Sequence, residues 1–274
     1  MRFFKNIFDF YLNASIHVAL AVYILVQITL LNFDIDYDLN LSFVTFFGTI
    51  VIYNFIKYGS RAKKYFIVEK EQDKIIQVFS FLAGFTMLFF VFQLKNATWI
   101  GFLILGLISI FYVIPFHASK KNFRSLNGLK IYIVALVWSG VTVYLPILNA
   151  EMKITHDVLI EGIQRFLFVL VITLPFEIRD LQIDEKSLNT IPQQIGVQKT
   201  KLLGVILIDV FLLLELFKDD YTIKNLILLL IVKAAVIISL FFSKREQSKY
   251  YSSFYVESIP LIWYGVKVIL MTNL

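Results

Sequence analysis

Residues 222–242 of this chain read TIKNLILLLIVKAAVIISLFF, an almost continuous apolar run. At 1.5 Å of rise per helical residue, a run of this length extends for about 30 Å, which matches the hydrocarbon thickness of a bilayer. Polar and apolar residues do not alternate in it, as they would in a strand of a membrane barrel. We therefore expect a membrane-spanning α-helix, whose backbone polar groups are all bonded within the helix.

Eight further stretches of the same kind bring the expected number of spans to nine. No linker or low-complexity tract separates them, so residues 1–274 are expected to form a single domain. The predicted fold class is all-α, a polytopic bundle of nine transmembrane helices around a central cavity. The expected spans cover residues 11–32, 41–58, 75–94, 97–116, 129–149, 157–177, 200–217, 222–242 and 254–272.

The composition of the 274 residues supports a membrane protein, since 58% are hydrophobic and 17% charged, with a mean hydropathy of +0.75. Soluble domains are nearer half apolar and a quarter charged. This composition excludes a soluble enzyme, a disordered chain and a repeat solenoid. The absence of cysteine excludes disulfides, thiolate metal sites and cysteine nucleophiles.

The net charge of +6 points to a lipid bilayer rather than to nucleic acid, because the basic residues gather on one side of the predicted spans. That side holds the N-terminus and alternate loops and carries 19 Lys and Arg, against 4 on the other side. An excess of Lys and Arg marks cytoplasmic loops. We expect a cytoplasmic N-terminus and an outer C-terminus, in a bacterial inner membrane.

An acidic cluster follows the sixth predicted span, where residues 174–196 read LPFEIRDLQIDEKSLNTIPQQIG. Glu177, Asp180 and Asp184 are three and four residues apart, so a helix continuing from the span would place them on one face. Three like charges repel one another, and Mg²⁺ bound together with substrate phosphates would offset that repulsion. The alternative is a solvated helix end whose acids are neutralised by nearby basic residues.

The residues after the cluster extend the pattern to R-D-x-x-x-D followed by T-I-P-x-x-I-G. This resembles the second aspartate-rich motif of the UbiA-type membrane prenyltransferases, D-x-x-D-x-x-x-D and then T-L-P-x-x-x-G. The family also has nine transmembrane helices, with its motif loops on the cytoplasmic side. The residues in register with the motif are Glu177, Asp180, Asp184, Thr190, Pro192 and Gly196.

The resemblance implies a membrane enzyme that binds an isoprenyl diphosphate through Mg²⁺. Loss of diphosphate gives an allylic carbocation, which a hydrophobic acceptor, often an aromatic ring, attacks in a lipid-accessible cavity. Glu177, Asp180 and Asp184 would hold the metal, and Asp180 and Asp184 would be catalytic. In the family, the loop after the fourth span supplies a tyrosine and a basic residue that contact the diphosphate. The counterparts here are Tyr112, as a catalytic residue, and Lys120 or Lys121, while Arg179 would add a further diphosphate contact.

The chain departs from the family at the first motif, N-D-x-x-D-x-x-x-D, which belongs at the end of the second span. Asn54 is in place, but Phe, Tyr and Ala fill the three acidic positions, and Lys57 and Arg61 bring positive charge instead. We expect Asn54, Lys57 and Arg61 to bind diphosphate directly, because ammonium and guanidinium groups can bind phosphate oxygens. The alternatives are a catalytically silent relative, a different reaction on the same scaffold, or a basic loop that only sets topology.

Charged residues within the predicted spans need partners, because an isolated charge in a bilayer is costly. Asp209 and Lys233 are expected to pair between neighbouring helices, and Glu161 and Arg165 to pair within one helix. Near opposite ends of the last span, Glu257 and Lys267 are expected to snorkel. The remaining group is His17, which would either face the cavity or have a packing role.

A rival class is a transporter or lipid-binding membrane protein that uses Asp209 and Lys233 as a relay. Against this class, no pair of spans broken by Gly or Pro stands out in the two halves of the chain.

Overall fold

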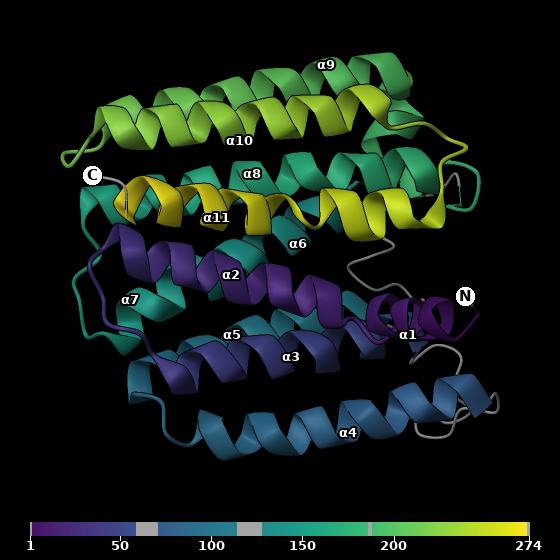
Figure 1. Ribbon diagram of the computed structural model, residues 1–274, viewed down its shortest axis with the longest axis horizontal. Helices are drawn as coiled ribbons and strands as arrows, with labels where there is room; N and C mark the ends of the chain where they lie inside the picture. The colour runs from purple at the N-terminus through teal and green to yellow at the C-terminus, as the bar shows by residue number, and fades with distance from the viewer. Residues whose placement is uncertain (1, 59–70, 114–127, 186–187, 273–274) are drawn as a thin grey trace.

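The computed structural model describes residues 2–58, 71–113, 128–185 and 188–272, and the regular elements in these ranges are helices. The long helices run side by side along the longest axis of the molecule, with α9 and α10 along one edge and α4 along the other (Figure 1). The α-helices are α1 (Arg2–Asn13), α2 (Ile16–Asn32), α3 (Leu39–Tyr58), α4 (Glu71–Val91), α5 (Asn96–Val113), α6 (Lys130–Ser139), α7 (Leu145–Asn149), α8 (His156–Asp180), α9 (Ile191–Leu214), α10 (Ile223–Phe242) and α11 (Ile259–Thr272).

Three short helical turns join or extend these helices. The π-helical turn η3 (Gly140–Tyr144) connects α6 to α7, and a second π-helical turn, η6 (Tyr251–Val256), precedes α11. The 3₁₀ turn η5 (Glu215–Phe217) ends α9. Because η3 keeps α6 and α7 in line, residues 130–149 form one candidate span.

Six helices in the described ranges are long and apolar enough to cross a membrane, and the bent pair α1–α2 would be a seventh. The chain is therefore a multi-pass membrane protein, but the expected number of nine spans is not confirmed. The helix α5 is apolar but shorter, and α9 contains a non-helical residue, Gly196 (φ 78°, ψ 164°).

The first predicted span, residues 11–32, is wrong as a single straight helix. The chain breaks between α1 and α2, which meet at an angle of 55°. Ser15 lies in the left-handed region at the break, with φ 61° and ψ 22°. This corner matters for the site described below, because it leaves the carbonyl groups at the end of α1 open to side chains from other helices.

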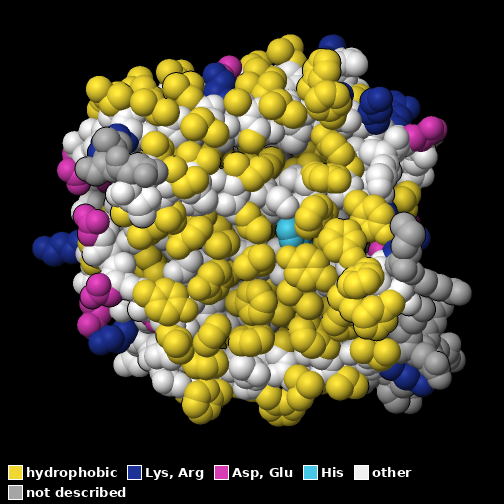
Figure 2. Space-filling view, in the orientation of Figure 1, with side chains coloured by type: hydrophobic (Ala, Val, Ile, Leu, Met, Phe, Trp, Pro, Cys, Tyr) yellow, Lys and Arg dark blue, Asp and Glu magenta, His cyan; other side chains and the backbone are white. Residues whose placement is uncertain are grey.

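A broad hydrophobic belt covers the face in Figure 2, and most of the charged side chains visible there gather at the two ends of the molecule. Many large apolar side chains are exposed along the helices, including Phe85, Phe89, Leu202 and Phe241. A patch of this size in water would be an interaction surface or a cause of aggregation. Along a bundle of apolar helices, it is the surface expected to face lipid.

The main core surrounds α8, the most buried of the candidate spans. Phe168 of α8 packs against Phe211 of α9 and Trp263 of α11, with ring centroids 6.1 and 5.1 Å away. The side chain of Tyr144 in η3 also packs so closely against Gly162 of α8 that an added Cβ would clash with the Tyr144 ring and hydroxyl. Tight packing of this kind fixes the direction in which the end of α8 points.

The N-terminus and the last turns of α3, α5 and α8 lie at one end of the bundle, and the C-terminus lies at the other (Figure 1). We call the first the N-terminal end and the second the C-terminal end. The helix ends expected to bear the motifs therefore meet on one side of the molecule.

Candidate functional site

The acidic cluster lies where α8 ends. Glu177 and Asp180 belong to the last turn of α8, but Asp184 follows the helix in a turn. The expectation that α8 continues through Asp184 is therefore wrong. The turn still places Asp184 close to the helix, because its backbone N–H donates to the carbonyl of Asp180 at 2.8 Å.

Lys130, the first residue of α6, joins two of the three acids. Its Nζ lies 2.9 Å from Glu177 Oε1 and 3.0 Å from Asp184 Oδ2. The side chains of Lys130, Glu177 and Asp184 are 16, 3 and 10% exposed, so the contact is largely buried. Here an ammonium group offsets the repulsion for which the sequence suggested a metal.

Sequence reasoning missed Lys130 as a site residue and counted it only as a basic residue of a cytoplasmic loop. Its position at the start of a span was the only available signal, since 54 residues separate Lys130 from Asp184 and nothing local connects it to the acids. Lys130 also interacts electrostatically with Tyr112 near the end of α5. This brings the predicted tyrosine to the same place as the acids.

Asp180 points to a different partner. Arg179 Nε and Nη2 donate to its two carboxylate oxygens at 2.7 and 3.2 Å, a bidentate arrangement. The guanidinium also reaches Ser253 Oγ of η6 at 3.5 Å and lies 5.2 Å from the ring centroid of Phe176. In this structure the three acids are therefore shared between two cationic side chains and do not converge on one point.

The donor chemistry of the cluster fits a hard divalent cation, because carboxylate oxygens are the ligands that Mg²⁺ prefers. Glu177 and Asp184 already converge on one positive charge, the ammonium of Lys130. A metal at this point would replace that ammonium on the same oxygens. Because these oxygens already surround one positive charge, the cluster is consistent with a divalent metal.

Local hydrogen bonds hold the segment that follows the acids. Thr190 precedes α9, and its backbone N–H donates to Gln193 Oε1 at 2.9 Å. Gln193 Nε2 in turn donates to the carbonyls of Asp184 and Glu185, at 3.4 and 3.1 Å. Gly196 has a positive φ of 78°, a conformation that favours glycine. This segment therefore fastens the start of α9 to the turn that bears Asp184.

Asn54 is buried near the end of α3 and bonds to the corner between α1 and α2. It accepts a hydrogen bond from Ser15 Oγ at 2.7 Å and donates to the carbonyl of Ala14 at 3.1 Å. It also donates to Ser80 Oγ of α4 at 2.8 Å. Its amide thus ties together three segments at the N-terminal end of the bundle.

Lys57, one turn further along α3, reaches the same corner. Its Nζ donates to the carbonyl of Leu12 at 3.3 Å and to Ser15 Oγ at 2.9 Å. It also interacts electrostatically with Arg179 and Glu257, so the ends of α3, α8 and η6 lie close together. Three other predicted diphosphate residues, Arg61, Lys120 and Lys121, lie outside the described residues.

The expected central cavity is present next to this cluster. A cavity of about 220 Å³ lies among α2, α3, α4, α5, α6 and η3, and it is almost entirely apolar. A second cavity of about 110 Å³ shares Tyr53 and Trp138 with it and reaches Ile56 and Tyr112. Trp138 Nε1 donates to Tyr53 Oη at 2.9 Å inside this space. The cavities therefore lead from the middle of the bundle to Tyr112, beside Lys130.

Comparison with known proteins gives similarity in structure only. No family model and no curated protein matches the chain. A UbiA homologue from Archaeoglobus fulgidus bound to Cd²⁺ has a TM-score of 0.62 at 12% identity, covering 95% of this chain and 99% of that one. The apo UbiA homologue from Aeropyrum pernix K1 has a TM-score of 0.61 at 12% identity, covering 95 and 98%. A structure of digeranylgeranylglyceryl phosphate synthase has a TM-score of 0.56 at 18% identity, covering 96% of each chain.

The chain has the UbiA fold. The expected resemblance is confirmed at the level of fold, over nearly the whole chain.

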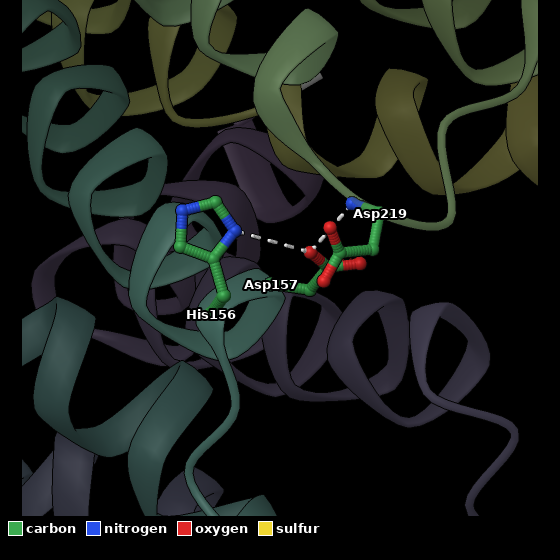
Figure 3. A group of neighbouring side chains, drawn as sticks. All are labelled: His156, Asp157 and Asp219. Carbon is green, nitrogen blue, oxygen red and sulfur yellow. Dashed lines mark hydrogen bonds and ion pairs between the residues drawn. The ribbon is translucent and has the colours of Figure 1, made fainter.

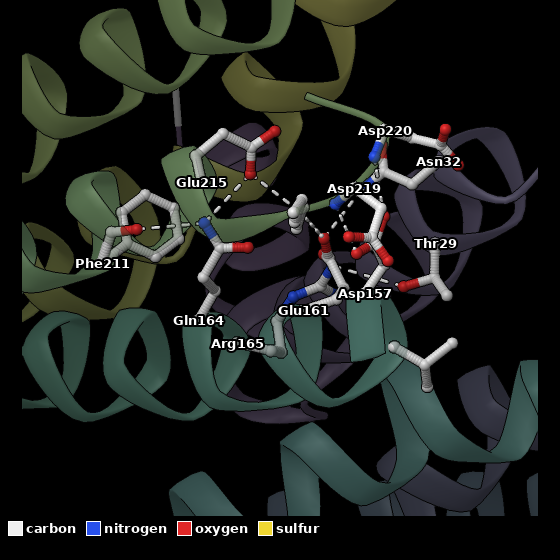
Figure 4. Close-up of polar contacts among 12 residues, drawn as sticks. Thr29, Asn32, Asp157, Glu161, Gln164, Arg165, Phe211, Glu215, Asp219 and Asp220 are labelled. Carbon is white, nitrogen blue, oxygen red and sulfur yellow. Dashed lines mark hydrogen bonds and ion pairs between the residues drawn. The ribbon is translucent and has the colours of Figure 1, made fainter. Parts of the chain in front are cut away.

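Two predicted charge pairs within the UbiA fold are confirmed. Asp209 and Lys233 form an ion pair of 2.5 Å between α9 and α10, and Arg165 bonds to Glu161 at 2.9 Å within α8. The second pair belongs to a larger buried network at the C-terminal end. Figure 4 shows Glu161, Arg165, Gln164 and Glu215 of this network. Lys218 lies 2.8 Å from both Glu161 and Glu215.

The other charged or polar groups in the spans, His17, Glu257 and Lys267, lie in different surroundings. His17 bonds to Tyr11 Oη at 2.7 Å and to the carbonyl of Phe254 at 3.0 Å, which supports the packing role. Glu257 interacts electrostatically with Lys57. The expectation that Lys267 snorkels is wrong, because its side chain is buried with only 6% exposure.

A second group of possible metal ligands lies at the C-terminal end, formed by His156, Asp157 and Asp219 (Figure 3). The Asp157 oxygens accept hydrogen bonds from the backbone N–H groups of Asp219 and Asp220, at 2.8 and 3.1 Å. Asp157 thus anchors the loop between η5 and α10, which accounts for its burial without a metal.

Proposed function

We propose that this chain is a divergent UbiA-type prenyltransferase, which transfers an isoprenyl group from an isoprenyl diphosphate to a lipophilic acceptor in the membrane. The observation that carries the proposal is the position of the polar cluster. Cations and carboxylates from α3, α6 and α8 gather where an apolar cavity reaches Tyr112. This arrangement suits a substrate with an anionic head and a long apolar tail.

Cationic side chains would bind the diphosphate. Lys57 donates to neutral oxygens, and its only acidic neighbour within the described ranges is Glu257, with which it interacts electrostatically without forming an ion pair. Its ammonium would therefore be able to bind a phosphate oxygen. Arg179 offers a planar fork suited to phosphate oxygens. Asn54, with Arg61, Lys120 and Lys121 from outside the described ranges, would complete the contacts. These charges stabilise the negative charge that develops on the leaving diphosphate.

The carboxylates would hold Mg²⁺ beside the diphosphate, with Glu177, Asp180 and Asp184 as ligands. The metal supplies further neutralisation of the leaving group. Glu177 and Asp184 would then hold the metal in place of the ammonium of Lys130, and Lys130 would be able to bind a phosphate oxygen. The Tyr112 hydroxyl would contact the same group, and the apolar cavity below would exclude water from the allylic cation.

Thermal unfolding of the purified protein tests this proposal. Geranylgeranyl diphosphate and Mg²⁺ are added separately and together. We expect strong stabilisation only when both are present, since each ligand completes the site of the other. The variant Asp180→Asn should lose this joint effect, whereas Asp34→Asn, an exposed acid at the other end of the bundle, should keep it. Joint stabilisation that survives in Asp180→Asn would contradict the proposed site.

Turnover separates an enzyme from a silent relative. Release of diphosphate from the same substrate is measured in the presence of a panel of lipophilic acceptors, among them phenols and lipid alcohols. Binding without release in any of them would favour the silent relative. The relay of a transporter gains no support from the structure, because Asp209 and Lys233 are paired with each other.

The membrane orientation belongs to the same proposal. The polar cluster lies at the N-terminal end, which the distribution of Lys and Arg assigns to the cytoplasm of a bacterial cell. Lys249 is an exposed residue at that end and can be replaced by cysteine. A membrane-impermeant reagent should label this cysteine only after the cells are opened.

A further inference from the structure

We propose a second binding site, at the C-terminal end of the bundle, in which Lys267 binds the phosphate group of an anionic ligand. This site is independent of the proposed prenyl transfer. It is a pocket of about 290 Å³ between the end of α2, the start of α10 and the last turns of α11. The polar residues of its lining are Asn32, Thr222, Lys224, Asn225 and Lys267.

Lys267 is the central observation. Its side chain is only 6% exposed and lines the pocket, yet it forms no hydrogen bond and no ion pair with the described part of the chain. An uncompensated charge in the interior is strongly unfavourable. A buried ammonium that borders an open pocket therefore calls for a partner inside that pocket.

Three acids interact electrostatically with Lys267, namely Glu161, Glu215 and Asp34. Asp34 is exposed and does not line the pocket, whereas Glu161 and Glu215 are buried and already engaged. The two oxygens of Glu161 bind Arg165 and Lys218, and the second also accepts from Asn32 at 3.1 Å. Glu215 binds the same Lys218. Figure 4 shows several of these contacts converging beside the end of α2.

This network is balanced without Lys267, because two carboxylates face one guanidinium and one ammonium. Lys267 therefore adds a surplus positive charge, and the exposed Lys224 adds another at the rim of the pocket. The amide of Asn225 and the hydroxyl of Thr222 can donate hydrogen bonds beside them. Two cations with neutral donors are the usual surroundings of a phosphate.

The rest of the lining is apolar, formed by Leu31, Leu228, Leu270 and Met271. A pocket that is cationic on one side and apolar on the other matches the headgroup region of a phospholipid. A free phosphate ion offers the same oxygens without using the apolar side. The shared chemistry is a phosphate group, and the two sources can be separated by experiment.

Native mass spectrometry of the detergent-solubilised protein is the first arm of the test. Dioleoylphosphatidylglycerol is titrated in, with dioleoylglycerol as the matched lipid that lacks the phosphate. We expect the wild type to retain the first lipid and not the second. Lys267→Met should weaken retention at least tenfold, and Lys267→Arg should keep most of it. The control is Lys153→Met, which removes an exposed charge at the same end and should change nothing.

The second arm measures thermal unfolding in inorganic phosphate against chloride of equal ionic strength. Stabilisation by phosphate that disappears in Lys267→Met identifies a free ion as the ligand, and lipid retention alone identifies a headgroup. The proposal would be overturned if Lys267→Met retained phosphatidylglycerol as well as the wild type and was stabilised by phosphate to the same extent. Because Lys267→Met removes a buried charge that has no ion pair in the described ranges, we expect the variant to fold at least as stably as the wild type.

Discussion

Replacing Lys130 by methionine tests the charge balance at the mouth of the cavity. In the wild type the ammonium lies 2.9 Å from Glu177 and 3.0 Å from Asp184, and these contacts are largely buried. Removing one partner of a buried ion pair leaves the other charge uncompensated, at a cost of about 3–5 kcal/mol. Since each kcal/mol shifts Tm by roughly 2–4 °C in a protein of this size, the expected fall is about 6 to 20 °C.

The assay is thermal unfolding in detergent with EDTA, followed by addition of Mg²⁺. A metal that binds the released carboxylates should restore part of the loss, about 2.7 kcal/mol at a hundredfold excess over Kd. The double variant Lys130→Met with Glu177→Gln should also recover, because it removes one of the two buried negative charges.

The matched control is Lys95→Met, which breaks an ion pair with Glu151 whose side chains are 55 and 70% exposed. Exposed pairs contribute about 0–1 kcal/mol, so this variant should unfold near the wild type. Equal Tm values for Lys130→Met and Lys95→Met would refute the reasoning, because the bridge would then carry no more energy than a surface pair.

Three further predictions concern other parts of the chain. Gly196→Ala should lower the free energy of unfolding by about 1–3 kcal/mol, because the φ and ψ of Gly196 belong to a region nearly exclusive to glycine. The control Gly106→Ala, which has open space around the added Cβ, should leave thermal unfolding unchanged. Tyr53→Phe should lower the free energy of unfolding by about 1–3 kcal/mol and alter tryptophan fluorescence, because it leaves the indole N–H of Trp138 without its acceptor. An unchanged fluorescence spectrum and an unchanged Tm would count against that hydrogen bond. Burial opposes protonation of Lys218, but the two carboxylates beside it outweigh burial and raise its pKa. The stability that the Lys218 charge contributes should therefore be fully present below pH ~10.5 and lost as the pH rises further. Unfolding measured as a function of pH should show this alkaline loss of stability in the wild type but not in Lys218→Met.

The helices could be predicted from the sequence because a membrane helix satisfies its backbone locally. A run such as residues 223–242 needs no distant partner to become α10. The same locality explains why the pair Glu161–Arg165 was predictable, since four residues of helix place the two side chains together. The corner at Ser15 was not predictable, because its positive φ has no marker such as glycine.

The candidate site divides in the same way. The sequence by itself determined that this is a helical membrane protein and that Glu177, Asp180 and Asp184 stand near one helix end, because these properties depend on neighbours within a few residues. Only the tertiary structure decided that Lys130 bridges two of those acids and that Asn54 bonds to the α1–α2 corner. It also decided that Lys267 is buried without a hydrogen bond or ion pair to the part of the chain that the structure describes. Each of these facts depends on how helices distant in the chain pack side by side, which the pattern of residues along any one helix does not specify.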